Sequence, residues 1–132
     1  MNARYCAPLD RLEVRALLVA ARDDVATPGR WVSGYLALDK HGKLVSPRAR
    51  EARQFCAWGA LAKNDPSGTD HEEDPVGTGQ MGELGVEALR VLDRAARLLN
   101  ADSALVVNDL GTHRLVLRMF ARAIALAGKP NP

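Results

Sequence analysis

Cys56, His113, Asn108 and Asp109 are the residues whose types could support a reaction in this chain. A cysteine attacks as its thiolate, a histidine takes up the proton, and an amide or carboxylate orients the imidazole. Cys56 lies in the stretch RQFCAWGAL, and His113 follows the other two residues in VVNDLGTHRLVL. Brought together by the fold, these side chains would suit a cysteine-dependent hydrolase or acyl transferase.

The position of Cys56 relative to a helix decides between this interpretation and a structural one. Ser46-Pro47 is typical of a helix start and predicts a helix over residues 47–63. Cys56 would then lie well inside the helix and pack as a small apolar side chain beside Gly59 and Ala60. If the chain instead stays irregular through Gln54, Cys56 lies at a helix start, which favours the thiolate. We favour the buried, structural role.

Two other sets of side chains could bind a ligand or a partner. Arg114, Arg118 and Arg122 recur every four residues and therefore share one face of a predicted helix. This face could bind phosphate or an acidic partner, although a solvated helix face explains it more simply. Trp31 and Tyr35 could cover one end of the core, or could form the aromatic part of a pocket or an interface.

The sequence carries no metal or cofactor motif. The three histidines, at positions 41, 71 and 113, include no i, i+4 pair, and no C-x-x-C is present. The run DHEED at 70–74 lacks the ligand spacing and central glycine of a calcium loop. We therefore expect no metal and no cofactor, and a solvated acidic segment at 70–74.

Three further helices are predicted by apolar periodicity. The first starts near Arg11, after the capping residue Asp10, and ends at Thr27-Pro28-Gly29. The others cover about 83–99 and 113–127, the last capped by Thr112. The inward face of the first helix is predicted to contain Val14, Leu17, Leu18, Ala21 and Val25.

The remaining segments are predicted to be strands, turns and one long loop. Residues 31–45 read as a short β-hairpin around a turn at Asp39–Gly42. Residues 64–82 are rich in glycine and acids and are predicted to be a loop. Ser103–Val107 is an apolar run, after which Asn108 and Asp109 should lie in a tight connection.

The composition indicates one mainly helical domain. The chain has 132 residues, of which 47% are apolar and 26% charged, and its net charge is +2. This balance argues against nucleic acid and anionic membranes as partners, and no apolar run is long enough to span a bilayer. Cys6 and Cys56 could form a single bridge, but they lack the dense spacing of a secreted disulfide scaffold, so a cytoplasmic location with reduced thiols is expected. The fold class is α, or α+β with a small hairpin, with about four helices in a single domain over residues 1–132.

Three segments together resemble a family of small bacterial and phage proteins known only as a domain of unknown function. They are WVSGYLALDKHGKLV, EARQFCAWGAL and VVNDLGTHRLVLRMFARAI, preceded by the helix RLEVRALLVAARD. The matching positions are Trp31, Gly34, Cys56, Gly59, Asn108, Asp109 and Thr112. The sequence departs from the family in the acidic loop, and at Leu115, where a glutamate would complete a capping box.

The resemblance implies no activity, so the function rests on the residues. We expect a non-enzymatic binding or regulatory module that acts through a protein–protein interface, with a homodimer as one arrangement. The first alternative is the cysteine-dependent enzyme that uses Cys56 and His113. The second is a pocket protein in which arginine holds an anion between the hairpin and the helices.

Overall fold

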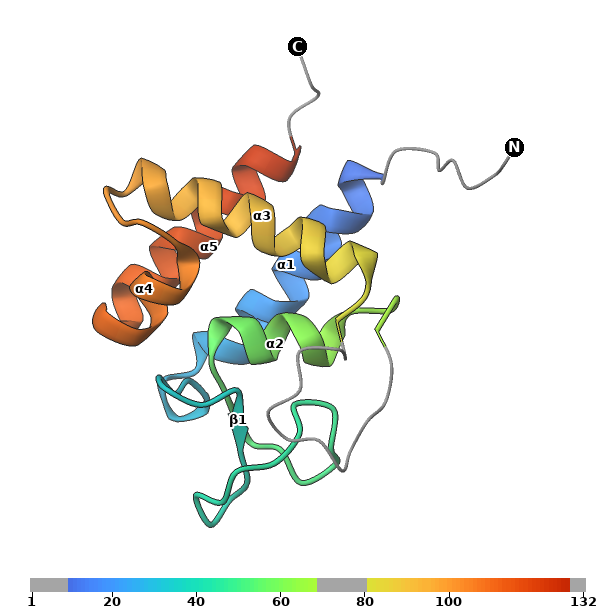
Figure 1. Ribbon diagram of the computed structural model, residues 1–132, viewed down its shortest axis with the longest axis vertical. Helices are drawn as coiled ribbons and strands as arrows, with labels where there is room; N and C mark the ends of the chain where they lie inside the picture. The colour runs from blue at the N-terminus through green and yellow to red at the C-terminus, as the bar shows by residue number, and fades with distance from the viewer. Residues whose placement is uncertain (1–9, 69–80, 129–132) are drawn as a thin grey trace.

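The computed structural model describes residues 10–68 and 81–128, which form a mainly helical fold with one small sheet (Figure 1). Its elements are α1 (Arg11–Ala26), the 3-10 helix η1 (Pro28–Arg30), β1 (Ala37–Leu38), β2 (Gln54–Phe55), α2 (Ala57–Asn64), α3 (Glu83–Leu98), α4 (Ala104–Leu110) and α5 (His113–Gly128). The predicted fold class is confirmed, with one more helix among the described residues than expected. Cys6, His71 and the acidic run 70–74 lie outside the described residues.

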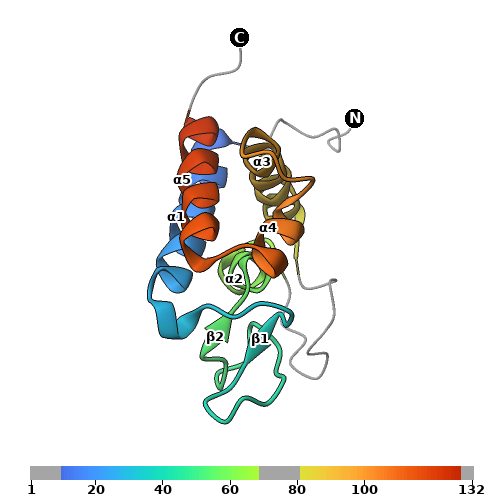
Figure 2. The ribbon, with the colours of Figure 1, turned by 90° about the vertical axis from the view of Figure 1, so that its left-hand side faces the viewer.

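The three long helices and α2 enclose a single core. α1 packs against α2, α3 and α5, and α3 packs against α5. Figures 1 and 2 show the helices at one end of the molecule and the sheet with its loops at the other, with α2 between them. The largest side chains with no exposed surface are Leu18, Phe55, Leu61, Leu92, Met119 and Phe120. These side chains join the sheet and the helices in one core.

The first helix forms as its sequence pattern predicts. The Asp10 carboxylate accepts the backbone N–H of Leu12 at 2.8 Å and caps the helix. The buried residues of α1 are the predicted ones: Val14, Leu17, Leu18, Ala21 and Val25. Pro28 follows the end of α1 at once and begins η1.

The helix predicted over 47–63 is wrong in its first half, since α2 begins only at Ala57. Sheet pairing takes the backbone donors that a helix would have used. The N–H of Arg53 donates to the carbonyl of Leu38 at 2.8 Å, and that of Cys56 to Leu36 at 3.2 Å. The chain is therefore extended up to Cys56, which becomes the residue before the helix.

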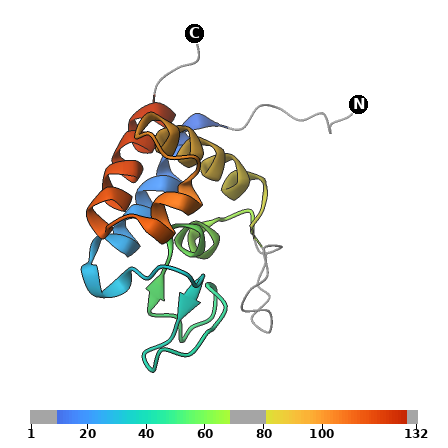
Figure 3. The same ribbon diagram turned by 60° about the vertical axis from the view of Figure 1, so that its left-hand side comes forward.

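The hairpin prediction is correct for the turn and wrong for the main strand partner. Asp39 Oδ1 accepts the N–H groups of His41 and Lys43, both at 2.8 Å, and Gly42 has a φ of 80°. A single antiparallel bridge then joins Leu38 to Leu44. The two-stranded antiparallel sheet instead pairs β1 with β2, in the register Ala37↔Phe55 (Figure 3).

The apolar run at 103–107 belongs to a helix that periodicity did not predict. Ser103 Oγ accepts the N–H of Val106 at 3.3 Å, and Asp93 of α3 accepts that of Ala104 at 2.8 Å, so α4 is capped twice. Asn108 and Asp109 consequently lie in the last turn of a helix and not in a loop. The Thr112 cap of α5 is confirmed by its bond from the N–H of Leu115 at 3.1 Å.

Candidate functional site

Cys56 lies at the N-cap of α2 with its thiol buried. Its Sγ accepts the N–H of Gly59 at 3.3 Å, and only 4% of the residue is exposed. The pKa of the thiol is raised to about 11, mainly by burial and to a smaller extent by the charge of Asp109, against the lowering effect of the helix N–H groups. Desolvation outweighs the helix start, so the thiol is neutral at physiological pH.

Asn108 connects α4 to the start of α2 and to the tryptophan. Its Oδ1 accepts two hydrogen bonds of 2.9 Å, one from Trp31 Nε1 and one from the backbone N–H of Ala57. Its Nδ2 donates to Asp109 at 3.1 Å, and Asp109 accepts the N–H of Gly34 at 3.2 Å. Asn108 therefore joins α4 to the start of α2, next to Cys56.

His113 makes other contacts than those a catalytic base for Cys56 would need. Its Nε2 lies 2.6 Å from the carbonyl oxygen of Val25, and its ring lies 5.3 Å from that of Trp31 between centroids. The structure thus brings Asn108 and Asp109 to the Cys56 end of α2. It places His113 against the end of α1 and records no hydrogen bond between His113 and Cys56 in the described chain.

A small hollow opens beside Cys56. Its volume is about 170 Å³, and its lining residues are Gly34, Tyr35, Leu36, Leu44, Cys56, Leu105 and Asp109. This volume is below the usual range of pockets that hold a cofactor or a drug-sized ligand. Tyr35 is 54% exposed at this surface. Trp31 is partly buried, and its indole N–H donates to Asn108.

The arginine row on α5 is exposed as expected. Arg114, Arg118 and Arg122 all lie on the solvent side of the helix. The buried face of α5 holds Val116, Met119, Phe120, Ala123, Ile124 and Ala127 instead. Binding by this row remains a prediction.

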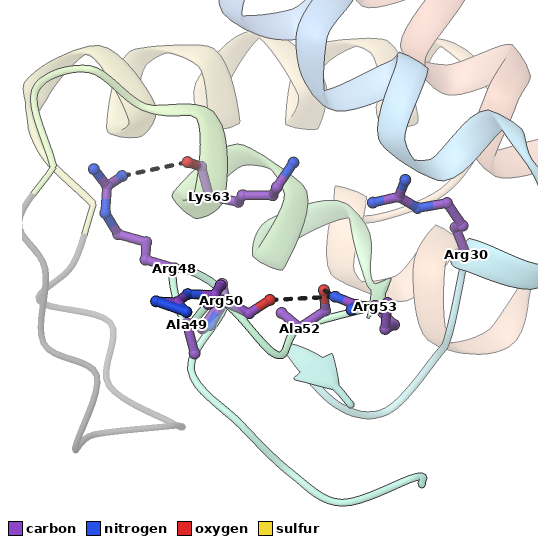
Figure 4. Close-up of a pocket in the computed structure, with 8 residues that line it drawn as sticks. Arg30, Arg48, Ala49, Arg50, Ala52, Arg53 and Lys63 are labelled. Atoms are coloured by element: carbon purple, nitrogen blue, oxygen red, sulfur yellow. Dashed lines mark hydrogen bonds between the residues drawn. The ribbon is translucent and has the colours of Figure 1, made fainter. Parts of the chain in front are cut away.

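A larger hollow, of about 440 Å³, is lined mainly by cations (Figure 4). We call it the cationic hollow. Its lining residues are Arg30, Pro47, Arg48, Ala49, Arg50, Ala52, Arg53 and Lys63. They come from η1, from the turns before β2 and from the last turn of α2. The sequence did not predict this site. Arg48, Arg50 and Arg53 are close together in the sequence, but Arg30 and Lys63 are far from them and join them only in the fold.

Arg30 and Lys63 share a single carboxylate. Asp24 Oδ2 lies 2.9 Å from Lys63 Nζ, and Asp24 Oδ1 lies 3.5 Å from Arg30 Nη2. Asn64 also donates to Asp24 at 2.7 Å. The two cations lie over the same Phe55 ring, at 5.7 Å for Arg30 and 5.3 Å for Lys63. The ring thus forms an apolar floor beneath two positive charges.

The other arginines of the cationic hollow are held in different ways. Arg48 Nη1 donates to the carbonyls of Ala62 at 2.7 Å and Asp65 at 3.0 Å, which satisfies the end of α2. Arg53 Nη1 donates to the carbonyls of Arg50 at 3.2 Å and Ala52 at 3.3 Å. Figure 4 shows the Arg48 guanidinium bonded to the carbonyl of Lys63 and that of Arg53 bonded to the carbonyl of Arg50. Such tethers fix the direction of each guanidinium.

Two further features of the described chain bear on the kind of site. Within residues 10–68 and 81–128, no group of three histidine, cysteine or acidic side chains could hold a metal ion. In the same ranges, no helix is long and apolar enough to cross a membrane.

Comparisons with known proteins give a family but no activity. No curated protein and no solved structure matches the chain. The match to a protein family covers residues 10–126, which include both hollows and all the described helices up to the last turn of α5. This protein therefore belongs to the family of unknown function DUF6197.

Proposed function

We propose that the protein is a non-enzymatic binding module that takes an anionic ligand in the cationic hollow. One observation carries this proposal. Five positive side chains, from Arg30, Arg48, Arg50, Arg53 and Lys63, line one concave surface. Among the described residues, Asp24 forms ion pairs with Arg30 and Lys63, whereas Arg50 and Arg53 form none.

The charge balance of this site differs from that of the chain. Among the described residues, Arg30, Arg50, Arg53 and Lys63 together with Asp24 leave a net charge of +3 at the hollow. The entire sequence carries a net charge of only +2. A concave surface with one sign of charge concentrates ligands of the opposite sign. Arginine also offers a planar pair of donors that suits carboxylates and phosphates.

Two features of the cysteine site support a non-catalytic role. The raised pKa leaves the Cys56 thiol protonated, and a protonated thiol is a poor nucleophile. The carbonyl of Val25 occupies Nε2 of the proposed base, His113. Cys56 then serves as the cap of α2, as its bond with Gly59 indicates.

The test is an anion titration followed by the backbone amide NMR signals at constant ionic strength. Citrate, sulfate and phosphate serve as probes. We expect saturable shifts in residues 48–53, and Arg50→Gln should lower the affinity about tenfold. Arg50 suits the test because its exposed side chain makes no hydrogen bond within the described ranges.

Arg118→Gln on α5 is the matched control, since it removes the same charge from an exposed arginine outside the cationic hollow. It should leave the affinity within about twofold, as expected for a surface charge outside the site. Equal losses in the two variants would show that the ions bind to net charge alone. The absence of saturable shifts with all three ions would also overturn the proposal.

A protein interface over α4 is a second candidate, favoured by its exposed apolar side chains. Leu105, which is 50% exposed, and Tyr35, which is 54% exposed, line the smaller hollow. Leu110, which is 83% exposed, follows its lining residue Asp109 in the chain. Apolar groups of this kind mark contact surfaces. Sedimentation at rising concentration tests a homodimer there: Leu105→Ser with Leu110→Ser should abolish any self-association, and an unchanged dimer would exclude this face.

A further inference from the structure

We infer that the ligand of the cationic hollow is a small compound with two phosphoryl groups, recognised through those groups and not through an aromatic ring. The inference rests on the proposed anion-binding function and names its ligand class. The position of the cations, their hydrogen bonds, the lining of the hollow and its volume all support this ligand class.

The cations form two sets on separate segments. Arg30 and Lys63 come from η1 and from the end of α2, and both contact Asp24. Arg50 and Arg53 come from the turns before β2 (Figure 4). In Figure 4 the charged ends of Arg30 and Lys63 point toward one another, and Arg50 and Arg53 lie below them. A ligand with two anionic groups can contact both sets at once.

The first set has unused hydrogen-bonding capacity. The Nε of Arg30 is buried and has no acceptor among the described residues. Its ion pair with Asp24, at 3.5 Å, is longer than a well-formed charged hydrogen bond. Asp24 is also engaged by Lys63 and Asn64, so one carboxylate serves three donors. A phosphoryl group has three oxygens and would supply the acceptors that this set lacks.

The second set is fixed in advance. Two carbonyls hold Nη1 of Arg53, and this leaves Nη2 without an acceptor in the described chain. A guanidinium already held in place loses little conformational freedom on binding. Arg50 adds an exposed charge on the same segment. This arrangement suits an anion that arginine can grip with two parallel hydrogen bonds, as phosphate allows.

The lining excludes recognition by stacking. None of the described residues that line the cationic hollow is aromatic, and Phe55 lies fully buried below its cations. Single-stranded nucleic acids and nucleobases rely on exposed aromatic faces. The volume of about 440 Å³ falls within the range of small-molecule sites. Two phosphoryl groups carry about three to four negative charges, which is close to the net charge of +3 that the two sets and Asp24 carry.

The test uses inorganic pyrophosphate as the probe, with phosphate, citrate and a nucleoside diphosphate as comparisons, by calorimetry on the full chain at constant ionic strength. We expect one pyrophosphate per chain, bound at least tenfold more tightly than phosphate or citrate. The nucleoside diphosphate should bind within threefold of pyrophosphate, because the base gains no contact.

Variants then locate the two ends of the ligand. Arg30→Gln and Arg50→Gln should each reduce the pyrophosphate affinity about tenfold, towards the affinity for phosphate, while Arg118→Gln changes it less than twofold. Thermal melting checks that Arg30→Gln is folded, since Arg30 also contacts Asp24 and Phe55. Arg50→Gln removes none of the described hydrogen bonds and decides the case if Arg30→Gln is unstable.

The results separate this inference from the function on which it rests. Citrate that binds as tightly as pyrophosphate overturns the phosphoryl class and leaves an anion site in place. A nucleoside diphosphate that binds more than tenfold tighter than pyrophosphate overturns recognition through phosphoryl groups alone. If none of the probes binds saturably, both the inference and the proposed function fail.

Discussion

Trp31 and Asn108, 77 positions apart in the sequence, are joined by a 2.9 Å hydrogen bond from the indole N–H to the amide oxygen. The same oxygen accepts the N–H of Ala57 at 2.9 Å, and Asn108 is 2% exposed. One side chain therefore connects three distant parts of the fold: the segment after η1, the start of α2 and the end of α4.

Replacing Asn108 with alanine should destabilise the protein by about 3 kcal/mol, because it leaves two donors without an acceptor at a buried site. Thermal unfolding should show a melting temperature lower by about 10 °C. Trp31→Phe removes one of the two donors and leaves the oxygen with its other bond, so the part of the destabilisation that comes from hydrogen bonding should be smaller. An Asn108→Ala protein as stable as the wild type would show that this oxygen has no structural role.

The stability of the protein should fall as the pH rises from 9 towards 11. The pKa of Cys56 is about 11 in the folded state against 9.0 ordinarily, so between these values the unfolded chain loses the proton first. The free energy of unfolding should decrease there by about 2.5 kcal/mol from this thiol alone. Below pH 9 both states keep the proton, and the thiol adds no pH dependence.

Urea unfolding at a series of pH values measures this effect when Cys56→Ser is compared with its parent, both with Cys6→Ser. Serine preserves a side-chain cap for α2 and does not ionise. The difference in stability between the two proteins should shrink above pH 9. A constant difference would mean that the folded thiol titrates normally, which would also reopen the catalytic hypothesis for Cys56.

Gly59→Ala should destabilise the protein by about 3 kcal/mol. A β-carbon at this position would collide with the backbone carbonyl oxygen of Leu36, and backbone atoms cannot turn aside as a side chain can. The higher helix propensity of alanine offsets only about 1 kcal/mol of this cost. Gly29→Ala is the control, because nothing lies within 4 Å of its added carbon. Denaturant unfolding of both variants should show a large loss for the first and almost none for the second.

Asp65→Ala should cost about 3 kcal/mol, since the carboxylate is fully buried and accepts four hydrogen bonds. Its Oδ1 accepts the N–H and hydroxyl of Ser67, and its Oδ2 accepts the N–H groups of Gly82 and Gly85. Asp65→Asn retains one acceptor oxygen and should lose less. Asp23→Ala, which breaks only an exposed ion pair with Arg22, should leave the unfolding midpoint nearly unchanged. Similar midpoints for Asp65→Ala and Asp23→Ala would contradict this role.

Local signals predicted those parts of the fold whose causes are local. The buried face of α1, the Asp10 and Thr112 caps and the Asp39 turn depend on neighbours within a few residues. The start of α2 could not be predicted in this way. Ser46-Pro47 has the composition of a helix start, but residues 47–51 form turns, and the carbonyls of Leu38 and Leu36 hold residues 53–56 in an extended form.

The candidate site was hidden for a similar reason. Arg30, Arg50 and Lys63 belong to three segments that meet only after β2 pairs with β1 and α2 packs on α1. The row on α5 was easier to see because a helix places every fourth residue on one face. Asn108 was found as a position of interest, although its helix was not. In this chain, the sequence predicts which residues share a helix face, but not which residues from different loops lie close together.

The bonds of Asp65 have a consequence for how the chain can vary in length. Asp65 Oδ2 binds Gly82, and the carbonyl of Asp65 binds Gly68, so the fold is closed across residues 69–80 by a direct clasp at their base. The closure entropy of a loop changes only slowly with its length. Extra residues, or a reporter peptide, can therefore be inserted between Gly68 and Met81 at little thermodynamic cost.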